Sequence, residues 1–348
     1  MREIIDKLAS ERRLTKQEWV AVIENRTPEL AEYLFKKARQ EQAKHYGNEI
    51  FIRGLIEFTN YCRNNCFYCG IRAGNRNIER YRLTKEEILE CCELGDQIGF
   101  RTFVLQGGED MHFTTDEMLD IITNIKKRYP EHALTLSVGE RDYDTYLAFF
   151  NAGADRYLLR HETANKEHYD SLHPKALSHA RRRECLSYLK KIGYETGTGF
   201  MVGSPGQTAE HLAEDMLFIT DFDPDMIGIG PFLPHHDTPF AHEKAGTVEL
   251  TLYMIGLIRL LIPSVLLPAT TALGSAEEAG RSQAVLAGAN VIMPNLSPLN
   301  VRKKYLLYDN KISTGVETAE GITQLAEDME KIGYKLVFSR GDRNKSDI

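Results

Sequence analysis

Three cysteines lie close together in the sequence, at Cys62, Cys66 and Cys69, with the spacing C-x3-C-x2-C. Three thiolates on one short loop can bind three irons of a cubane iron–sulfur cluster and leave the fourth iron open to another ligand. A zinc site normally has four protein ligands, and no fourth Cys or His lies nearby in the sequence. A three-ligand catalytic zinc ion and three unrelated buried cysteines are the alternatives. The spacing favours the open cluster.

The other three cysteines, Cys91, Cys92 and Cys185, fall in segments with helical patterning. On a helix, a cysteine usually acts as a small buried hydrophobic residue. Such clustering is not typical of secreted disulfide frameworks. The N-terminus is charged where a signal peptide would need its apolar core. These features predict a reducing, cytoplasmic setting.

Composition excludes several classes of protein. The chain has 348 residues, 42% of them apolar, with 43 Lys and Arg against 50 Asp and Glu and a net charge of −7. It is therefore not a disordered chain, a collagen or a small disulfide scaffold. The mild acidity argues against nucleic acid as a partner. The most apolar stretch, 252–269, contains Arg259 and Pro263, so it predicts an amphipathic helix and a buried strand, with no membrane as partner.

Short β-rich apolar runs alternate with amphipathic segments along most of the chain. This alternation predicts a parallel sheet with right-handed crossovers, and its size matches a closed (β/α)8 TIM barrel. An open doubly wound sheet is the alternative, although the dinucleotide glycine fingerprint is absent after the first strand. Thr84, Thr114 and Thr208 are expected to begin helices. The eight predicted strands are 50–58, 102–105, 134–138, 157–159, 196–202, 226–229, 265–267 and 291–293.

This pattern divides the chain into three parts. We expect a helical cap at 1–49, the barrel at 50–296 and a C-terminal extension at 297–348 that packs on the barrel. The extension should contain a helix near 318–332. Its polar end, 339–348, is expected to be frayed.

Barrel enzymes gather their active sites at the ends of their strands, so the residues there are candidates. The cysteine loop follows the first strand. The second strand ends in Gly107, Gly108 and Glu109, where glycines allow a close backbone approach. On the third strand Thr135 and Ser137 share one face. Small hydroxyls facing the lumen suggest ligand contacts, although plain barrel packing remains the alternative.

The fourth strand ends in Arg160 and Glu162, which also share a face. A buried charged pair is unfavourable unless it is paired or liganded. The lumen position therefore favours function, with a mutual salt bridge as the alternative. The later run 181–183 consists of three arginines, a pattern more typical of a solvated helix face.

The remaining strands end in small and polar residues. His235, His236 and Asp237 could bind a metal, but a Pro-rich loop is the favoured interpretation. Threonines and tyrosines around an arginine suit a small polar or anionic ligand better than an apolar one. The residues expected to form this substrate site are Thr135, Arg160, Thr270, Thr271, Tyr305 and Tyr308.

The cysteine motif, with the aromatic Tyr68 before its last cysteine, resembles that of radical S-adenosylmethionine (SAM) enzymes. In that family the three cysteines hold a 4Fe–4S cluster, and the amino and carboxylate groups of SAM chelate the unique iron. The resemblance implies that Glu162 binds the SAM ribose, Arg182 the SAM carboxylate and Arg160 an anionic group of the substrate in catalysis. The complete set of SAM contacts that it implies is Tyr68, Gly107, Gly108, Glu109, Ser137, Glu162, Arg182 and Met201.

The segments 158–165, 228–232, 268–272 and 290–295 resemble one branch of this family, the FeFe-hydrogenase maturases of the HydE type. This resemblance implies action on an iron complex bearing carbon monoxide, cyanide and cysteine, which HydG supplies. The product would go forward to HydF for assembly of the diiron subcluster.

Two relatives compete with this interpretation. Biotin synthase needs a second cluster held by cysteines on barrel strands, and no predicted strand contains a cysteine. Methylornithine synthase, a mutase acting on lysine, is similar in size. Some HydE proteins bind a peripheral second cluster near the C-terminus, but 311–324 has no cysteine, so we predict one cluster. A non-catalytic iron–sulfur carrier is the alternative from another class.

Overall fold

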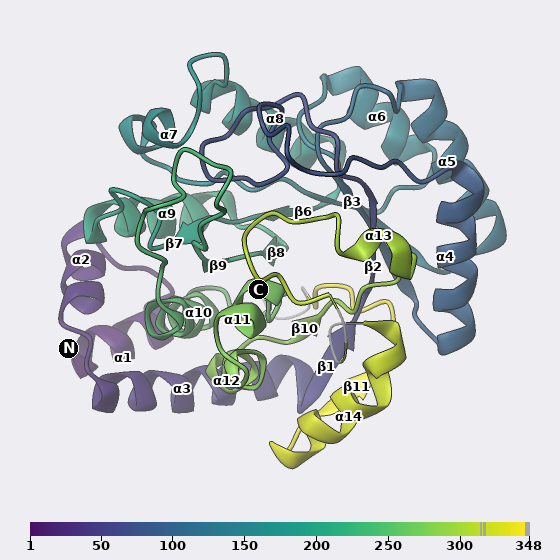
Figure 1. Ribbon diagram of the computed structural model, residues 1–348. Coiled ribbons are helices and arrows are strands. Elements are labelled where there is room, and N and C mark those ends of the chain that lie inside the picture. The colour runs from purple at the N-terminus through teal and green to yellow at the C-terminus, as the bar shows by residue number, and fades with distance from the viewer. Residues whose placement is uncertain (314, 316–317, 345–348) are drawn as a thin grey trace.

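A computed structural model describes residues 1–313, 315 and 318–344 (Figure 1). Its centre is a parallel barrel whose successive strands are joined mostly by helical connections, while β1 runs directly into β2. Six neighbouring strands form one sheet in the order β2-β3-β4-β5-β6-β8, and β1 pairs with β10. These strands are β1 (Glu49–Ile52), β2 (Gly54–Thr59), β3 (Thr102–Gly107), β4 (Ala133–Ser137), β5 (Arg156–Leu158), β6 (Glu195–Thr198), β8 (Met226–Ile227) and β10 (Val291–Ile292).

The barrel closes through the segment that was predicted as the seventh strand. Leu266 forms a parallel bridge to Met226, and Pro268 forms one to Val291. On the other side, Phe51 of β1 pairs with Val291 of β10. The predicted TIM barrel is therefore confirmed. The segment 265–267 occupies its expected place, but single bridges replace a regular strand there.

The helices surround the barrel (Figure 1). As predicted, Thr84, Thr114 and Thr208 each cap the helix that follows, because each threonine side chain accepts a hydrogen bond from the third amide of its helix. Two short strands, β7 (Met201–Val202) and β9 (Gly230–Pro231), follow β6 and β8 and pair with each other. The outer helices are α4 (Lys85–Ile98), α5 (Thr115–Arg128), α6 (Tyr143–Asn151), α7 (Lys166–Leu172), α8 (His179–Ile192), α9 (Ala209–Phe222), α10 (Val248–Leu261), α11 (Thr271–Ala276), α12 (Gly280–Ala287) and α13 (Leu299–Arg302).

The N-terminal helices extend the core over one side of the barrel. They are α1 (Arg2–Glu11), α2 (Lys16–Glu24) and α3 (Pro28–Tyr46), and they pack on α9, α10 and α12. Because α1 and α3 cover its outer side, α10 is buried at every residue from Thr251 to Leu261. The predicted amphipathic character of this helix is therefore wrong. Arg259 in its last turn donates to the carbonyls of Gly288, Pro263 and Val265 instead of reaching water. No helix in the described part of the chain is long and apolar enough to span a bilayer.

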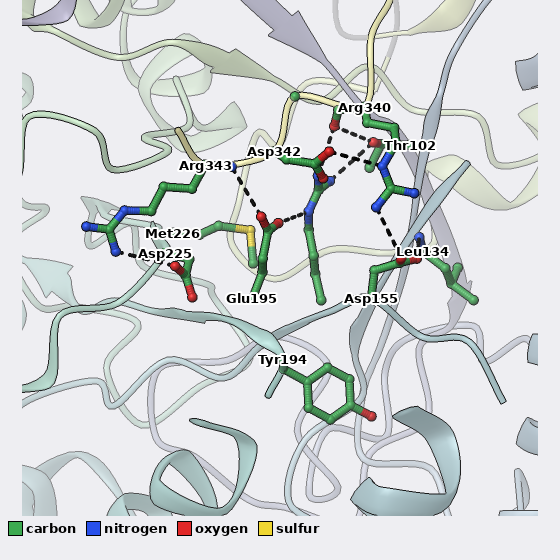
Figure 2. A network of polar contacts seen from close by, with 12 residues as sticks. Thr102, Leu134, Asp155, Tyr194, Glu195, Asp225, Met226, Arg340, Asp342 and Arg343 are labelled. Atoms are coloured by element: carbon green, nitrogen blue, oxygen red, sulfur yellow. Dashed lines mark hydrogen bonds and ion pairs between the residues drawn. The ribbon is translucent and has the colours of Figure 1, made fainter. Parts of the chain in front are cut away.

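The C-terminal extension returns to the end of the barrel at which the strands begin, here called the base. After a 3-10 turn (Ala319–Gly321), it contains α14 (Ile322–Lys331) and β11 (Lys335–Val337), which pairs with β1. Residues 339–344 then cross the base (Figure 2). The expected fraying of 339–348 is wrong for 339–344, while 345–348 lie outside the described residues.

An ionic network holds this tail. Arg156 is fully buried and pairs with both Glu195 and Asp342. Arg343 pairs with Asp223 at 2.9 Å and with Asp225 at 3.3 Å, and Figure 2 shows the pair with Asp225. A buried guanidinium is unfavourable unless ion pairs or hydrogen bonds satisfy it, and here the tail supplies part of the ion pairing.

Candidate active site

A cavity of about 310 Å³ opens at the other end of the barrel, the mouth, where the strands end. Side chains from the cysteine loop, from several strand ends and from the C-terminal extension line it together. The predicted site residues that line it are Cys62, Cys66, Tyr68, Cys69, Gly107, Gly108, Glu109, Ser137, Arg160, Glu162, Arg182, Met201, Thr270, Tyr305 and Tyr308.

Two predicted substrate residues lie outside the cavity lining. Thr135 is buried in the middle of β4, and its hydroxyl has no hydrogen-bond partner among the described residues. Thr271 is the first residue of α11, and its neighbour Thr270 faces the cavity instead. The prediction also missed several wall residues, of which Gln106 directly precedes the predicted glycines. The apolar members carried no chemical signal, and they are Ile71, Leu158, Leu159, Pro231, Phe232, Leu233, Ala272 and Leu307.

The backbone of the cysteine loop is held from three directions. Arg63 N–H donates to the Glu109 carbonyl after β3 at 2.9 Å, and Phe67 N–H donates to the Leu172 carbonyl of α7 at 3.0 Å. Gly70 N–H donates to the Leu307 carbonyl of the C-terminal extension at 2.8 Å. The loop is therefore positioned by segments that are far apart in sequence.

The three thiols fit a cluster better than a single ion. Burial raises the pKa of Cys69 to about 12 and raises the pKa of Cys62 and Cys66 as well. Thiolates form in such a place when positively charged iron binds and releases their protons. Among the described residues, the three sulfurs are not grouped at the spacing that one ion needs. This donor set therefore suits a 4Fe–4S cluster with three protein ligands.

Close packing explains the glycine at Gly108. A Cβ atom there would lie 2.1 Å from the carbonyl oxygen of Tyr61 and 2.7 Å from the Cβ of Cys62. Only glycine lets the end of β3 approach the start of the cysteine loop this closely.

The neighbouring Glu109 links the cysteine loop to the end of β4. Its Oε2 accepts from Arg63 at 3.0 Å, and its Oε1 accepts from the Glu140 amide at 2.9 Å. Gly139, with a φ of +79°, makes room for this carboxylate, because a Cβ there would lie 1.8 Å from the Glu109 Cγ. The side chain of Glu109 thus braces the site, which leaves the backbone of this turn to face the cavity.

Arg160 and Glu162 face each other across the cavity wall. Arg160 Nη2 lies 3.1 Å from Glu162 Oε2, so the predicted mutual pair does form. These two atoms and Arg160 Nε nevertheless make no hydrogen bond to another described residue. Glu162 also adopts a left-handed backbone, with a φ of +66°. Unused polar groups and local strain together are typical of ligand sites.

Arg182 is the buried member of its arginine run. Its Nε donates to Glu140 at 2.6 Å, and its Nη1 donates to the Arg160 carbonyl at 2.8 Å. Arg183 is exposed, and Arg181 pairs with Glu184 at the surface. The solvated-face interpretation therefore describes the two flanking arginines, while Arg182 points its charge into the site.

Tyr68 is oriented by a histidine. His173 Nδ1 lies 2.8 Å from the Tyr169 carbonyl and must donate to it, so His173 Nε2 accepts from the Tyr68 hydroxyl at 3.2 Å. Burial lowers the pKa of His173 to about 4, which keeps this imidazole neutral. The Tyr68 ring is thus fixed against the cavity.

Beside the predicted alternative of a metal at His235, His236 and Asp237, the structure places possible ligand atoms of His235, His236 and Asp309 within 4.8 Å of one another, although hydrogen bonds already engage several of them. His236 contacts Asp309 through Nδ1 at 2.6 Å and Asp237 through Nε2 at 3.2 Å, and the bond to Asp309 raises its pKa. His235 Nδ1 accepts from the Asp237 amide at 3.1 Å, so its proton resides on Nε2. An imidazole must offer a free lone pair to bind a metal. The favoured loop interpretation agrees with this arrangement.

A segment of the C-terminal extension, 304–312, crosses the mouth. The Lys304 carbonyl accepts from Asn60 at 2.7 Å, Asp309 N–H donates to Pro234 at 3.1 Å, and Ile312 N–H donates to Ser275 at 3.1 Å. This mouth segment brings Tyr305, Leu307 and Tyr308 to the cavity.

A closed parallel barrel with three cysteines of this spacing at its mouth defines a radical SAM enzyme. In agreement, a family model described as the Radical SAM superfamily matches residues 56–219. Enzymes of this superfamily use a 4Fe–4S cluster and SAM, and this chain does the same.

Comparison of whole sequences shows which family of radical SAM enzymes the chain resembles. The chain is 46% identical over 344 residues to the [FeFe] hydrogenase maturase subunit HydE of Thermotoga maritima, covering 99% of this chain and 98% of that protein. It therefore belongs to the HydE family.

Methylornithine synthases are more distant relatives. The 3-methylornithine synthase of Methanosarcina acetivorans is 28% identical over 326 residues, which cover 91% of each chain. A crystal structure of methylornithine synthase (PylB) superposes with a TM-score of 0.82 at 26% identity, covering 96% of this chain and 97% of the other.

Proposed function

We propose that this chain matures FeFe-hydrogenase by acting on an iron complex that bears carbon monoxide, cyanide and cysteine. HydG would supply this precursor, and the product would go to HydF for assembly of the diiron subcluster. The observation that carries the proposal is the 46% identity with a HydE maturase along nearly the whole of both chains. The cavity supports it, because its cysteines, arginines and tyrosines suit a small, polar, anionic substrate.

When bound, the cluster supplies one electron that cleaves the sulfonium of SAM and yields a 5′-deoxyadenosyl radical. The chain's own residues prepare this chemistry. Cys62, Cys66 and Cys69 would hold three irons. Arg182, which is fixed by Glu140, would place its positive charge on the SAM carboxylate. Glu162 would accept hydrogen bonds from the ribose hydroxyls through Oε2, which pairs with Arg160 but makes no hydrogen bond among the described residues.

Arg160 would bind the substrate. Its Nε has no hydrogen-bond acceptor among the described residues, and its Nη2 has there only the ion pair with Glu162; both atoms are buried. Cyanide and a cysteine carboxylate are anions that a guanidinium binds well. Thr270, Tyr305 and Tyr308 would complete this site. Apolar walls at Leu158 and Phe232 would limit water around a reactive radical.

A methylornithine synthase-like reaction is the second candidate, favoured by the similar fold and the 28% identity. A biotin synthase-like reaction is disfavoured, because Cys91 and Cys92 lie on α4 and Cys185 lies on α8, away from the barrel strands. With no further cysteine in the sequence, one cluster is expected.

A paired assay separates the candidates. Anaerobically reconstituted protein receives dithionite and SAM, with either the iron precursor or lysine. The proposal predicts 5′-deoxyadenosine together with consumption of the precursor, and no methylornithine. Conversion of lysine would favour the second candidate. Absence of 5′-deoxyadenosine from protein carrying about four irons per chain would reject radical chemistry.

A further inference from the structure

A buried ion pair joins the barrel lumen to the mouth segment. The pair consists of Glu57 and Lys311. Glu57 lies on β2 and faces the lumen, because its neighbours Ile56 and Phe58 pack outward in the core between strands and helices. Glu57 is 1% exposed, and its Oε1 pairs with the ammonium of Lys311, which is 5% exposed. The other oxygen accepts from Asn295 Nδ2 at 2.8 Å. Lys311 comes from the C-terminal extension, so its side chain enters the barrel from the mouth.

Lys311 contacts one wall of the cavity directly. Its Nζ donates to the Tyr305 carbonyl at 3.0 Å and lies 4.8 Å from the centre of the Tyr305 ring. The Tyr305 hydroxyl bonds to Gln106, another residue that lines the cavity. Tyr305 is therefore held at its backbone and its ring by Lys311, and at its hydroxyl by β3. Neither Glu57 nor Lys311 lines the cavity itself.

We propose that Glu57 and Lys311 are positioning residues that fix Tyr305, and that they thereby set where the substrate lies relative to SAM. The proposal rests on the proposed function in one respect, that this cavity binds the substrate. A buried ion pair often adds no stability over apolar residues of similar size. What the pair adds is geometry, because two charges in a low-dielectric lumen have one favourable arrangement.

The test uses four variants of the ion pair and one control variant, all in the full chain. Lys311→Met keeps the length of the side chain without its charge, and Glu57→Gln removes the charge of the partner. The double variant has no unpaired charge, so it remains informative if the single variants fold poorly. Lys311→Arg restores the charge. Lys304→Met is the matched control, because Lys304 lies in the same segment but pairs with Glu79 at the surface.

Two readouts separate positioning from mere stability. We expect Lys311→Met and the double variant to keep SAM binding and 5′-deoxyadenosine formation within about twofold. The same variants should raise KM for the precursor, and the 5′-deoxyadenosine spent per product, by about tenfold, the scale of a small misplacement in an active site. Lys311→Arg should recover most of the loss, and Lys304→Met should match the wild type.

Hydrogen exchange of the protein without cluster gives the second readout. Amides of 304–312 should exchange about tenfold faster in Lys311→Met and in the double variant, while those of β4 and β5 should not change. The positioning role would be overturned if a folded double variant showed the wild-type KM, the wild-type amount of 5′-deoxyadenosine spent per product and the wild-type hydrogen exchange. If the wild type converts no precursor, the proposed function fails, and the exchange experiment alone decides whether the pair fixes the mouth segment.

Discussion

The two ends of the barrel are both covered by the C-terminal extension, but they use their charges differently. At the base, Arg156 pairs with Glu195 and Asp342, and Arg343 pairs with Asp223 and Asp225. At the mouth, Arg160 and Glu162 keep polar atoms without a hydrogen bond to any described residue. Satisfied charges support the fold, whereas unsatisfied buried groups wait for a ligand. Substitutions at the base should therefore change stability, and substitutions at the mouth should change chemistry.

The largest effect is expected at the cysteine loop. Cys66→Ala removes one of three cluster ligands, so the cluster and 5′-deoxyadenosine formation should both be lost while the barrel stays folded. Iron content, visible absorbance and product analysis measure this. Cys185→Ala, a change at a buried helix cysteine, is the control and should keep the cluster. Radical formation by Cys66→Ala would contradict the assignment.

The next effect concerns Arg160, whose Nε makes no hydrogen bond among the described residues and whose Nη2 pairs with Glu162. Arg160→Gln should lower the conversion of precursor by about a hundredfold, because one charged anchor in a dry cavity is lost. Its free energy of unfolding should change by less than about 1 kcal/mol. Kinetics and urea unfolding of the same sample test both statements. A large loss of stability with intact kinetics would show that Arg160 belongs with the base arginines.

Arg156→Met should show the reverse behaviour. It leaves Glu195 and Asp342 without their shared partner, and we expect a loss of about 3 kcal/mol in the free energy of unfolding. Cleavage of SAM, measured per folded molecule, should remain near that of the wild type. If Arg156→Met abolished SAM cleavage without destabilising the chain, the two ends would not be separate in function.

Acid should loosen the base first. Burial alone would raise the pKa of Asp342. The hydrogen bond from Arg340 and the charge of Arg156 together outweigh burial, so the pKa lies below its ordinary 3.8. Its contribution is therefore present above pH 3.8 and is lost as the pH falls through the folded value. Amides of 339–344 should lose protection below about pH 4. Asp342→Asn should show this loss at neutral pH, and equal protection in that variant would contradict it.

Alkali should loosen the mouth, and this is the smallest effect. The hydrogen bond to Asp309 and the charges of Asp309 and Asp237 raise the pKa of His236 above its ordinary 6.5. Its contribution is complete below pH 6.5 and is lost as the pH rises through the folded value. Exchange of 304–312, corrected for intrinsic rates, should therefore increase between about pH 6 and about pH 9. His236→Gln should remove this dependence. An identical profile in that variant would contradict the assignment.

The same contrast marks what local sequence patterns could predict. The cysteine spacing, the alternation of strands and helices and the threonine caps are short-range signals, and the structure contains each of them. The tail at the base was mispredicted because its partners, such as Arg156 and Glu195, are distant in sequence. The pairing of Lys311 with Glu57 had no local signal either. The two residues are distant in sequence, and only the folded barrel brings them together.

The central claim is that this chain can do the work of a HydE maturase, and it is tested most directly by replacement. Anaerobically reconstituted protein takes the place of the Thermotoga maritima relative in a hydrogenase maturation mixture, and hydrogen evolution is measured. The account predicts active hydrogenase with the wild-type chain and none with Cys66→Ala. No activation by a wild-type chain that forms 5′-deoxyadenosine, or activation by Cys66→Ala, would contradict it.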